Sequence, residues 1–412
     1  MPATDNSLTT RVLTLIRARR HASTNLEKDP GIHPLFGTSP VQLREAKFSD
    51  YSAVTDLKRK WGLIPDSLAN WERLWRHNPA LQYTQAQPPM GWVLEAQDKV
   101  VGYLGNIPLR YHYGDQALIA VTGHGFVVEP AYRAMAMRLN SAFYRQGSVD
   151  LYLTTTAIEA VGKIARAFKC DALPQEDYDT VLFWVLQSYP FAQAVMKKLE
   201  FGPIISYIGG TFVSLAVASD KILRSRWPRR SGTSLLLKQI RVNEIGEDFE
   251  QLWLTKLDER ARLLANRDAA TLRWHFETPD DPGETCVFCC YKDGNLAGYA
   301  VMRTDPSQVT VLRRSTIIDT LAIADDPEIV RLLWTAAYDQ AKHVGSLVLE
   351  ILGFPRNVRQ ACSGWHPYQR SYPACPFYYK ASNSLLQSTL SNGDAWYACP
   401  FDGDTSLMPL CG

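Results

Sequence analysis

The sequence lacks the features that identify several large classes of protein. No segment approaches the roughly 18 uninterrupted apolar residues of a membrane-spanning helix, and the apolar run 13–16 is too short for a secretory signal peptide. The chain has 44 Lys and Arg against 42 Asp and Glu, a balance that indicates no nucleic-acid partner. Its eight cysteines are scattered over 412 residues and do not resemble a disulfide framework. We therefore expect a cytoplasmic protein without a membrane span.

Motifs of several common enzyme classes are also missing. The sequence contains no Gly-x-Ser-x-Gly nucleophile motif, no Walker phosphate loop and no dinucleotide-binding fingerprint. Cys286, Cys289 and Cys290 resemble half of a metal site, but no second spaced pair of Cys or His accompanies them. We interpret these cysteines as buried thiols and expect no metal.

The composition is that of a folded protein with more than one domain. Hydrophobic residues make up 46% of the chain and charged residues 21%, which is typical of soluble globular proteins. At about 100 to 200 residues per domain, the length suggests two or three domains. The polar, proline-containing segment 1–40 indicates an N-terminal arm, and the arginine-rich segment 226–233 indicates a linker.

The predicted order of strands and helices occurs twice. In 41–225 we expect a strand, two helices, a three-stranded meander, a helix, a strand and a further helix, and 234–382 shows a similar order. Two local similarities, 98–103 with 293–299 and 74–76 with 272–274, lie about 195 to 199 positions apart, which indicates duplication. We predict an α/β (α+β) protein of two tandem domains, each with a mixed, mostly antiparallel sheet flanked by helices. A turn-rich tail, 383–412, follows.

The most informative segment connects a strand that ends at Val128 to a helix predicted over 131–146. Pro130 opens this helix, so we expect the amide groups of its first turn, 131–135, to lack intrahelical partners and to attract an anion. The segment also offers small and cationic side chains that suit a phosphate: Ala134, Ala136, Arg133 and Arg138. A solvated basic helix start is an equally good interpretation of these residues.

This segment resembles the phosphate-binding loop of the GNAT superfamily of CoA-dependent N-acyltransferases. The residues that carry the resemblance are Val127, Val128, Pro130, Tyr132, Arg133, Ala136 and Arg138. In that family a [Gln/Arg]-x-x-Gly-x-[Gly/Ala] loop wraps the CoA diphosphate, and the preceding bulged strand pairs with the pantetheine arm. Arg133 matches the first position of the loop, whereas Ala136 and Arg138 replace its two small residues. The likeness covers about 41–200 and 234–382.

The resemblance implies a tandem-domain N-acyltransferase that moves an acyl group from a thioester of CoA, or of an acyl carrier protein, to an amine. The altered loop suggests a donor other than plain acetyl-CoA, such as a longer acyl-CoA. The residues expected to hold the donor are Phe126, Val127, Val128, Arg133, Ala134, Ala136, Arg138 and Thr155. The acceptor is left open between an amino sugar, a peptide lysine and a small amine.

Amide formation requires a base for the amine and an acid for the leaving thiolate. His124 is the first candidate base, because it lies on the strand at the predicted site and imidazole titrates near neutral pH; a hydrogen-bonded core histidine is the alternative. Glu129 is a second candidate base, or a helix cap. The tyrosine that the family often uses as acid corresponds to Ala165 here, so Tyr132 and Tyr152 are considered as substitutes. Tyr152 also fits a core position, and protonation of the thiolate by solvent is a further alternative.

The corresponding junction of the second domain carries carboxylates in place of small residues. Asp325, Asp326 and Glu328 would repel a diphosphate and instead satisfy the helix start themselves. We therefore expect a degenerate second domain and a donor site in the first domain only. The alternative function is a catalytically inactive binding scaffold made of both copies.

Overall fold

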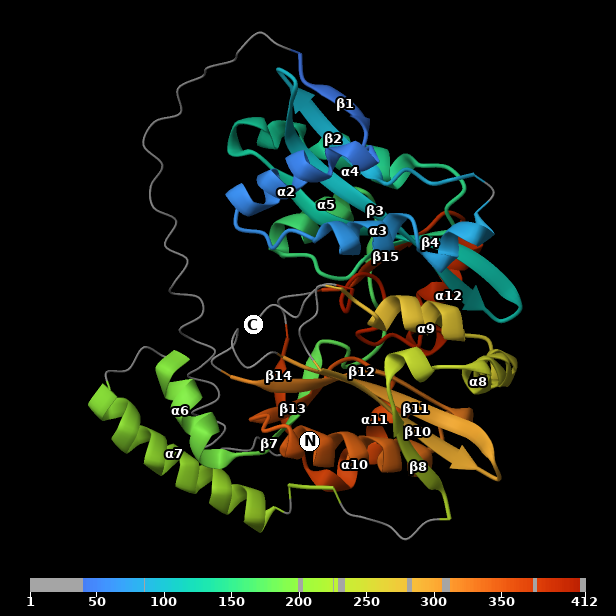
Figure 1. The fold of residues 1–412 in the computed structure, drawn as a ribbon. Coiled ribbons are helices and arrows are strands. Elements are labelled where there is room, and N and C mark those ends of the chain that lie inside the picture. Colours follow the sequence, from blue (N-terminus) through green and yellow to red (C-terminus); the bar gives the residue numbers. More distant parts are fainter. Residues whose placement is uncertain are drawn as a thin grey trace.

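The computed structural model describes residues 40–84, 86–198, 203–224, 226–228, 234–279, 284–305, 312–372 and 376–407. Within these residues the chain forms two sheets covered by helices, which lie one above the other in Figure 1. Most of the expected arm and linker, and the last part of the expected tail, lie outside the described residues. No helix in the described ranges is long and apolar enough to cross a membrane.

Both sheets are mixed but mainly antiparallel. The first has the order β1-β2-β3-β4-β5-β15-β6, with β9 beside β3, and the second has the order β14-β7-β13-β12-β11-β10-β8. The strands of the first sheet are β1 (Gln42–Glu45), β2 (Gly91–Ala96), β3 (Lys99–Tyr113), β4 (Gln116–Val128), β5 (Leu151–Thr154), β6 (Asp171–Ala172), β9 (Leu263–Ala265) and β15 (Tyr378–Ala381). Those of the second are β7 (Thr180–Val185), β8 (Leu236–Ile240), β10 (Glu284–Lys292), β11 (Asn295–Thr304), β12 (Arg314–Ala322), β13 (Val348–Ile351) and β14 (Tyr368–Ser371). The predicted fold class is confirmed.

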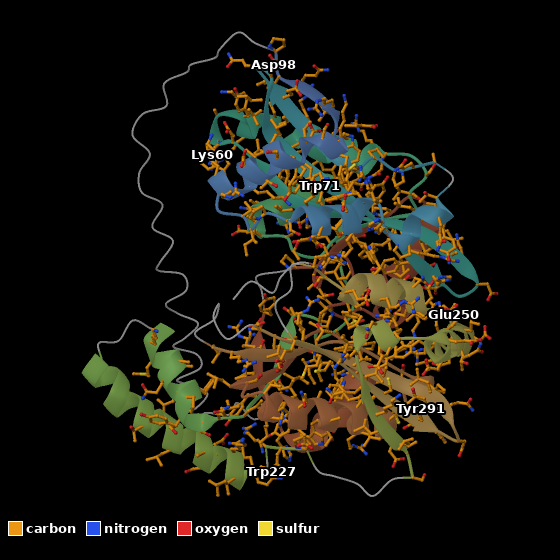
Figure 2. The ribbon with its side chains drawn as sticks, viewed as in Figure 1. Lys60, Trp71, Asp98, Trp227, Glu250 and Tyr291 are labelled. Carbon is orange, nitrogen blue, oxygen red and sulfur yellow. The ribbon has the colours of Figure 1, made fainter. Side chains whose placement is uncertain are left out.

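Helices follow the strands in the predicted order. The α-helices are α2 (Tyr51–Lys60), α3 (Leu68–Trp75), α4 (Ala136–Arg145), α5 (Glu159–Ala167), α6 (Ser188–Lys198), α7 (Pro203–Leu223), α8 (Glu247–Glu259), α9 (Ala269–Phe276), α10 (Pro327–His343), α11 (Arg356–Arg359) and α12 (Ser384–Leu390). Short 3₁₀ helices are η1 (Phe48–Asp50), η2 (Pro79–Tyr83), η3 (Pro130–Met135), η4 (Val242–Glu244), η5 (Ile323–Asp325), η6 (Gln360–Trp365) and η7 (Gly393–Ala395). In the first domain, α2 and α3 pack on one face of the sheet and α4 and α5 on the other. Figure 2 shows that side chains fill the space between the two sheets.

Local sequence explains why α2 and α3 form and which face they bury. In α2, the buried residues Val54, Leu57 and Lys58 recur at helical spacing, so one stripe faces the sheet. Helix α3 begins where the side chain of Ser67 accepts a hydrogen bond from the N–H of Asn70, which satisfies one of the free amides of the first turn.

Three strands belong to the sheet that the other half of the chain mainly forms. β7 lies within the range expected for the first domain, but it pairs with β13 and β14 of the second sheet. β15 was expected to close the second domain, but it pairs with β5 and β6 of the first sheet. β9, also within the range expected for the second domain, pairs with β3 of the first sheet. The sheets therefore do not follow the ranges 41–225 and 234–382 at these three strands. Short apolar strands fit either sheet by pattern alone, and long-range packing selects the partner.

The C-terminal segment, expected to be a turn-rich tail, is part of the core. After α12, the residues 395–407 are buried, apart from the half-buried Thr405. The aromatic side chains of Trp396, Tyr397 and Phe401 contribute to the main hydrophobic cluster. Their burial removes a large apolar area from water, which holds the segment against both domains.

Helices α3 and α9 meet where the two domains contact each other. Nη1 of Arg73 donates to the carbonyl oxygen of Trp274 at 2.6 Å, and Nε1 of Trp274 donates to the carbonyl oxygen of Arg73 at 2.9 Å. Each of these residues lies six positions after the N-cap of its helix, at Ser67 and Asp268. The contact is thus reciprocal and joins equivalent positions of the two halves.

Candidate active site

Strands β4 and β5 of the first sheet separate halfway along β4. They pair in parallel only from Ala120 to Thr122, whereas β4 continues along β3 as far as Val128. From Gly123 onward, the edge of β4 that faces away from β3 has no strand partner among the described residues. Such an edge offers peptide N–H and C=O groups to an extended ligand.

A β-bulge interrupts β4 at this separation. Gly105 of β3 pairs with His124 and Tyr103 pairs with Val127, so β4 contains one extra residue between the two pairs. Gly125, inside the bulge, has a φ of +62°, and a Cβ there would lie 2.5 Å from Nζ of Lys58, so only glycine fits. Bulges re-aim neighbouring side chains, here that of His124.

His124 is 1% exposed and is held through one ring nitrogen. Its Nε2 lies 3.1 Å from Oδ2 of Asp66, and the same oxygen accepts a hydrogen bond from Nζ of Lys58 at 2.6 Å. Burial would raise the pKa of Asp66, but the adjacent His124 and Lys58 lower it well below its usual value, so the carboxylate stays ionised. A carboxylate at Nε2 favours the tautomer with its hydrogen on Nε2, which leaves a lone pair on Nδ1.

Three buried polar atoms near the bulge have no hydrogen-bond partner in the described part of the chain. They are Nδ1 of His124, the hydroxyl oxygen of Thr122 and the hydroxyl oxygen of Tyr103. Thr122 and His124 are two residues apart on β4 and share one face of the sheet. Because buried polar atoms in folded proteins are nearly always bonded, such atoms indicate a place for a ligand or water.

The C-terminal segment reaches this place through Asp404. Its carboxylate accepts from the hydroxyl of Thr155 at 2.8 Å, and its N–H donates to the same hydroxyl at 3.1 Å. Thr156 also donates to the carboxylate, at 3.0 Å. Burial raises the pKa of Asp404, and the nearby His124 acts in the opposite direction. The hydroxyl of Thr155, expected to contact the donor, is therefore already bonded within the chain.

The helix after β4 begins later than expected. Residues 130–135 form the 3₁₀ helix η3, and α4 starts only at Ala136. The N–H of Tyr132 is bonded to the carbonyl oxygen of Glu129, and the N–H of Ala136 to that of Arg133. The expectation that the amides of 131–135 all lack partners is wrong, because a 3₁₀ turn closes its hydrogen bonds one residue earlier than an α-helix.

The residues expected to hold the donor are found at different places around the separation. Arg133 and Ala134 are exposed on η3, and Ala136 is half-buried. Arg138 donates from Nη1 to the carbonyl oxygen of Val41 at 2.8 Å, so its guanidinium group is directed to the start of β1. On β4, successive side chains point to opposite faces of the sheet. Val127 packs in the hydrophobic cluster on the α2 side, and Phe126 and Val128 pack against the cluster on the α4 side.

Glu129 and Tyr132 lie beside the site without a hydrogen bond to His124. Oε1 of Glu129 accepts from Nζ of Lys60 at 2.6 Å, and the Glu129 side chain caps no amide of η3. Tyr132 is half-buried against the hydrophobic cluster under α4. The structure thus brings His124 together with Asp66, whereas Glu129 and Tyr132 contact neither of them by a hydrogen bond.

The second sheet has the same separation, but the chain fills it. β12 and β13 pair in parallel from Arg314 to Ile317 and then diverge. Beyond this point the hydroxyl of Tyr397 donates to the carbonyl oxygen of Thr320 on β12, and the N–H of Phe354 donates to the carbonyl oxygen of Ala398. The C-terminal segment therefore occupies the space between the diverging strands.

Two carboxylates lie at the helix start of the second domain: Asp326 accepts a hydrogen bond from the N–H of Glu328 at the start of α10, and Asp325 is buried just before it. Asp325 accepts hydrogen bonds from Lys256 at 2.7 Å, from Arg262 at 2.7 Å and from Asn357 at 2.8 Å. Burial would raise the pKa of Asp325, but Arg262 and Lys256 lower it well below the usual value. The charge that a phosphate would bring is already supplied by this side chain.

Sequence patterns did not identify Lys58, Asp66 or Asp404 as site residues. One signal was available for Lys58: it lies four positions after Val54 on the apolar stripe of α2, where a lysine must find a buried anion. Asp66 precedes a helix, and Asp404 lies in a turn. Aspartate is common at both kinds of position, so neither residue stands out in the sequence. Only the three-dimensional contacts show their role.

No family model matches the chain, and no curated protein is similar to it in sequence. Among solved structures, a probable N-acyltransferase of unknown function from Enterococcus faecalis is similar over 83% of this chain and 72% of that one, with 9% identity and a TM-score of 0.54. A GCN5-related N-acetyltransferase from Anabaena variabilis matches over 84% and 73%, with 11% identity and a TM-score of 0.51. N-myristoyltransferase of Saccharomyces cerevisiae, solved with myristoyl-CoA and inhibitors, matches over 85% and 82%, with 11% identity and a TM-score of 0.50. The chain therefore has the fold of the GNAT superfamily, in its tandem form.

Proposed function

We propose that the protein is an N-acyltransferase that moves an acyl group from a thioester donor, lying along the free edge of β4, to an amine. One observation carries this proposal: His124 stands at the β4 bulge with Nε2 held by Asp66 and with Nδ1 free of any partner in the described residues. A base that is oriented by a carboxylate and keeps its second nitrogen without a partner has the arrangement that proton transfer requires.

The donor would lie in extended form between β4 and the end of β5. The edge from Gly123 to Val128 supplies peptide groups for the pantetheine arm, and the exposed guanidinium group of Arg133 supplies charge for a phosphate. Because the amides of η3 are partly bonded, phosphate binding depends more on Arg133 than the sequence suggested. CoA and a carrier protein both present a phosphopantetheine thioester to this edge.

The reaction is a direct transfer. The acceptor ammonium loses one proton to solvent before it attacks, and neutral His124 accepts at Nδ1 the second proton, from the nitrogen that becomes the amide. The new C–N bond forms at the thioester carbon, the C–S bond breaks, and the electron pair leaves with the thiolate. The thiolate takes a proton from solvent, since thiols are acidic enough to leave without a dedicated acid. Asp66, itself held by Lys58, keeps the imidazole in place during the proton transfer and the acyl transfer.

The test compares thioester donors and histidine variants. Purified protein is incubated with acetyl-CoA, longer acyl-CoAs and acyl carrier protein, each with an amino sugar, a lysine peptide and small amines, and amide formation is measured by mass spectrometry. We expect transfer with at least one longer donor, strong loss in His124→Ala, and no change in His77→Ala, an exposed control histidine. Donor binding without transfer in any combination would instead favour the inactive scaffold, and full activity of His124→Ala would exclude the proposed base.

A further inference from the structure

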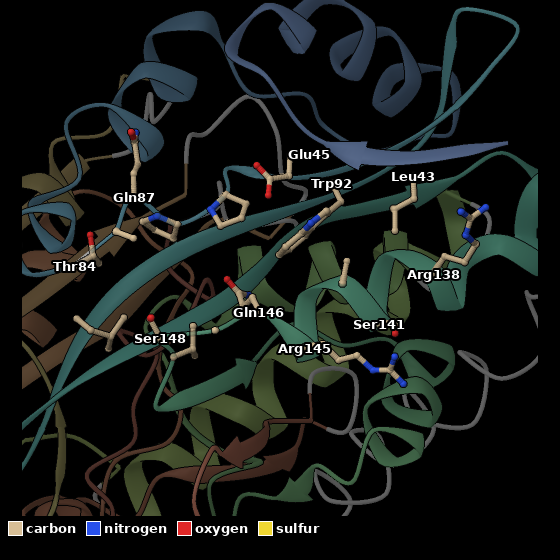
Figure 3. A pocket seen from close by; sticks show the side chains of 17 residues that line it. Leu43, Glu45, Thr84, Gln87, Trp92, Arg138, Ser141, Arg145, Gln146 and Ser148 are labelled. Carbon is tan, nitrogen blue, oxygen red and sulfur yellow. The ribbon is translucent and has the colours of Figure 1, made fainter.

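A pocket of about 630 Å³ lies on the face of the first domain opposite to His124 (Figure 3). Its wall residues Trp92 and Val149 belong to the hydrophobic cluster on the α4 side of the sheet, whereas His124 contacts Asp66 and Trp75 on the other side. The pocket is bounded by β1, β2, the segment before β2 and α4. Pockets that bind small molecules typically measure about 300 to 1,000 Å³, so this one is large enough for a ligand.

Apolar side chains form the larger part of the pocket surface. They are Leu43, Ala86, Pro88, Pro89, Trp92, Ile119, Ala142 and Val149. Leu43 lies on β1 and Trp92 on β2, so the two neighbouring strands form one wall, and Ala142 of α4 leaves room on the opposite wall. An indole ring beside aliphatic side chains suits a hydrocarbon chain.

Two arginines stand on the α4 wall. Arg138 and Arg145 are seven residues apart, which is two helical turns or about 10 Å. Both are exposed, and Arg145 has no ion-pair partner in the described part of the chain. Ser141 lies between them in Figure 3, and Glu45 on β1 is the carboxylate among the lining residues. The α4 wall therefore favours an anionic group next to the apolar floor.

We propose that this pocket binds a single-chain amphiphile with an anionic head group, a carboxylate or a phosphate. The chain would lie against Trp92 and Leu43, and the head group would be bound by Arg145 together with Arg138. This assignment also explains why an arginine stands at position 138, where the related loops carry a small residue: its guanidinium group belongs to the pocket and to β1. Because the pocket lies on the opposite face of the sheet, the inference does not depend on the proposed function.

The experiment is calorimetric titration of the full chain with three probes of equal chain length, all below their micellar concentrations. The probes are dodecanoate, dodecyl phosphate and the neutral glycerol monoester of dodecanoic acid. We expect saturable binding of one or both anions and at least tenfold weaker binding of the neutral ester. The tighter of the two anions identifies the head group.

Two variants and one control locate the binding. Arg145→Glu should weaken the anion at least tenfold, and Ala142→Trp should abolish binding by filling the pocket. Arg59→Glu, which changes an exposed arginine of α2 outside the pocket, should bind like the wild type. Thermal melting of each variant establishes that it is folded. Three results would each overturn the proposal. They are no binding of either anion by the wild type, an affinity for the neutral ester equal to that for the anions, and an equal change of affinity in Arg145→Glu and Arg59→Glu.

Discussion

In the first half of the chain His124 stands opposite Gly105 of β3, and in the second half Asp319 stands opposite Val301 of β11. The ion-pair partner of each also occupies an equivalent position, because Asp66 and Arg267 both directly precede the N-cap of the second helix of their domain. The charges are thus reversed: a histidine faces a carboxylate in one half, and a carboxylate faces a guanidinium group in the other.

The two buried pairs also differ in how completely their polar atoms are bonded. Asp319 accepts hydrogen bonds from Arg267 at 3.1 Å and from Tyr299 at 2.7 Å, and Cys399 of the C-terminal segment covers it at 3.4 Å. Burial alone would lower the pKa of Arg267, but Asp319 raises it well above its usual value, so the pair stays charged. His124 keeps one nitrogen free of partners in the described residues. We call the first half open, because the edge of β4 beyond Thr122 has no strand partner among the described residues, and the second half closed, because the C-terminal segment lies between β12 and β13.

The largest expected effect is the loss of acyl transfer when His124, the proposed base of the open half, is replaced. His124→Ala should lower kcat about 10²- to 10⁴-fold, the usual contribution of a general base. Asp66→Asn keeps the shape but removes the charge that orients the imidazole, and should cause a smaller loss of kcat with little change in KM. Because Lys58 is then buried without its counter-charge, the free energy of unfolding should fall as well. Single-turnover transfer assays measure both losses of kcat. A loss confined to KM would show that His124 binds the acceptor and does not act as a base.

A substitution at the buried ion pair of the closed half should lower the stability of the protein and leave its catalytic activity unchanged. Asp319→Asn leaves Arg267 buried without its counter-charge, which should lower the free energy of unfolding by about 3 to 5 kcal/mol. Urea denaturation measures this change, and donor binding below the transition should stay close to that of the wild type. Loss of transfer in a variant that remains fully stable would contradict the division of roles between the halves.

The C-terminal segment that connects the two sites should make stability depend on pH. Burial raises the pKa of Asp402 to about 6, although Arg267 and the hydrogen bonds from Cys399 and Tyr111 act against burial. A carboxyl group whose pKa is raised on folding stabilises the protein fully below about pH 4, and this contribution is lost as the pH rises through about 6. A shift of about two units corresponds to about 3 kcal/mol.

Asp402→Asn isolates this contribution. The difference in unfolding free energy between wild type and variant should change in favour of the variant between about pH 4 and pH 6 and stay constant above that. Denaturation at a series of pH values in this window measures it. A difference that is independent of pH would show that Asp402 does not change its protonation on folding.

The smallest effect on stability and on kcat is expected for Glu129, which lies beside the open site without a hydrogen bond to His124. The ion pair between Lys60 and Glu129 is largely exposed on the lysine side, so Glu129→Gln should change stability by less than about 1 kcal/mol. Its kcat should stay within a few-fold of the wild type if His124 is the base. A loss as large as that of His124→Ala would transfer the role of base to Glu129.

Much of the fold could be predicted from the sequence, because helical and strand spacing and the repeated segments are local signals. Val54 and Leu57 indicate the buried stripe of α2, and Gly102 and Gly298, each followed by tyrosine, mark the same position of the two meanders. The exchange of β7 and β15 could not be predicted, because their residues fit either sheet and the choice depends on contacts across the whole chain.

The candidate site could be predicted only in part. The strand that carries His124 and the following turn were found from the strand pattern that ends at Val128 and from Pro130, which are local features. The contact with Asp66, and the arrival of Asp404 from the far end of the chain, depend on how separate elements pack. A 3₁₀ start and an α-helical start share the same sequence pattern, so the early hydrogen bonds of η3 were not apparent.

A crystal structure of the protein with a non-transferable acyl-CoA analogue, in which a thioether replaces the thioester, tests the central claim most directly. The account predicts the pantetheine arm along the edge of β4 from Gly123 to Val128, with the sulfur within a few ångströms of His124. An analogue bound between β12 and β13 in place of Tyr397, or excluded from both separations, would contradict it.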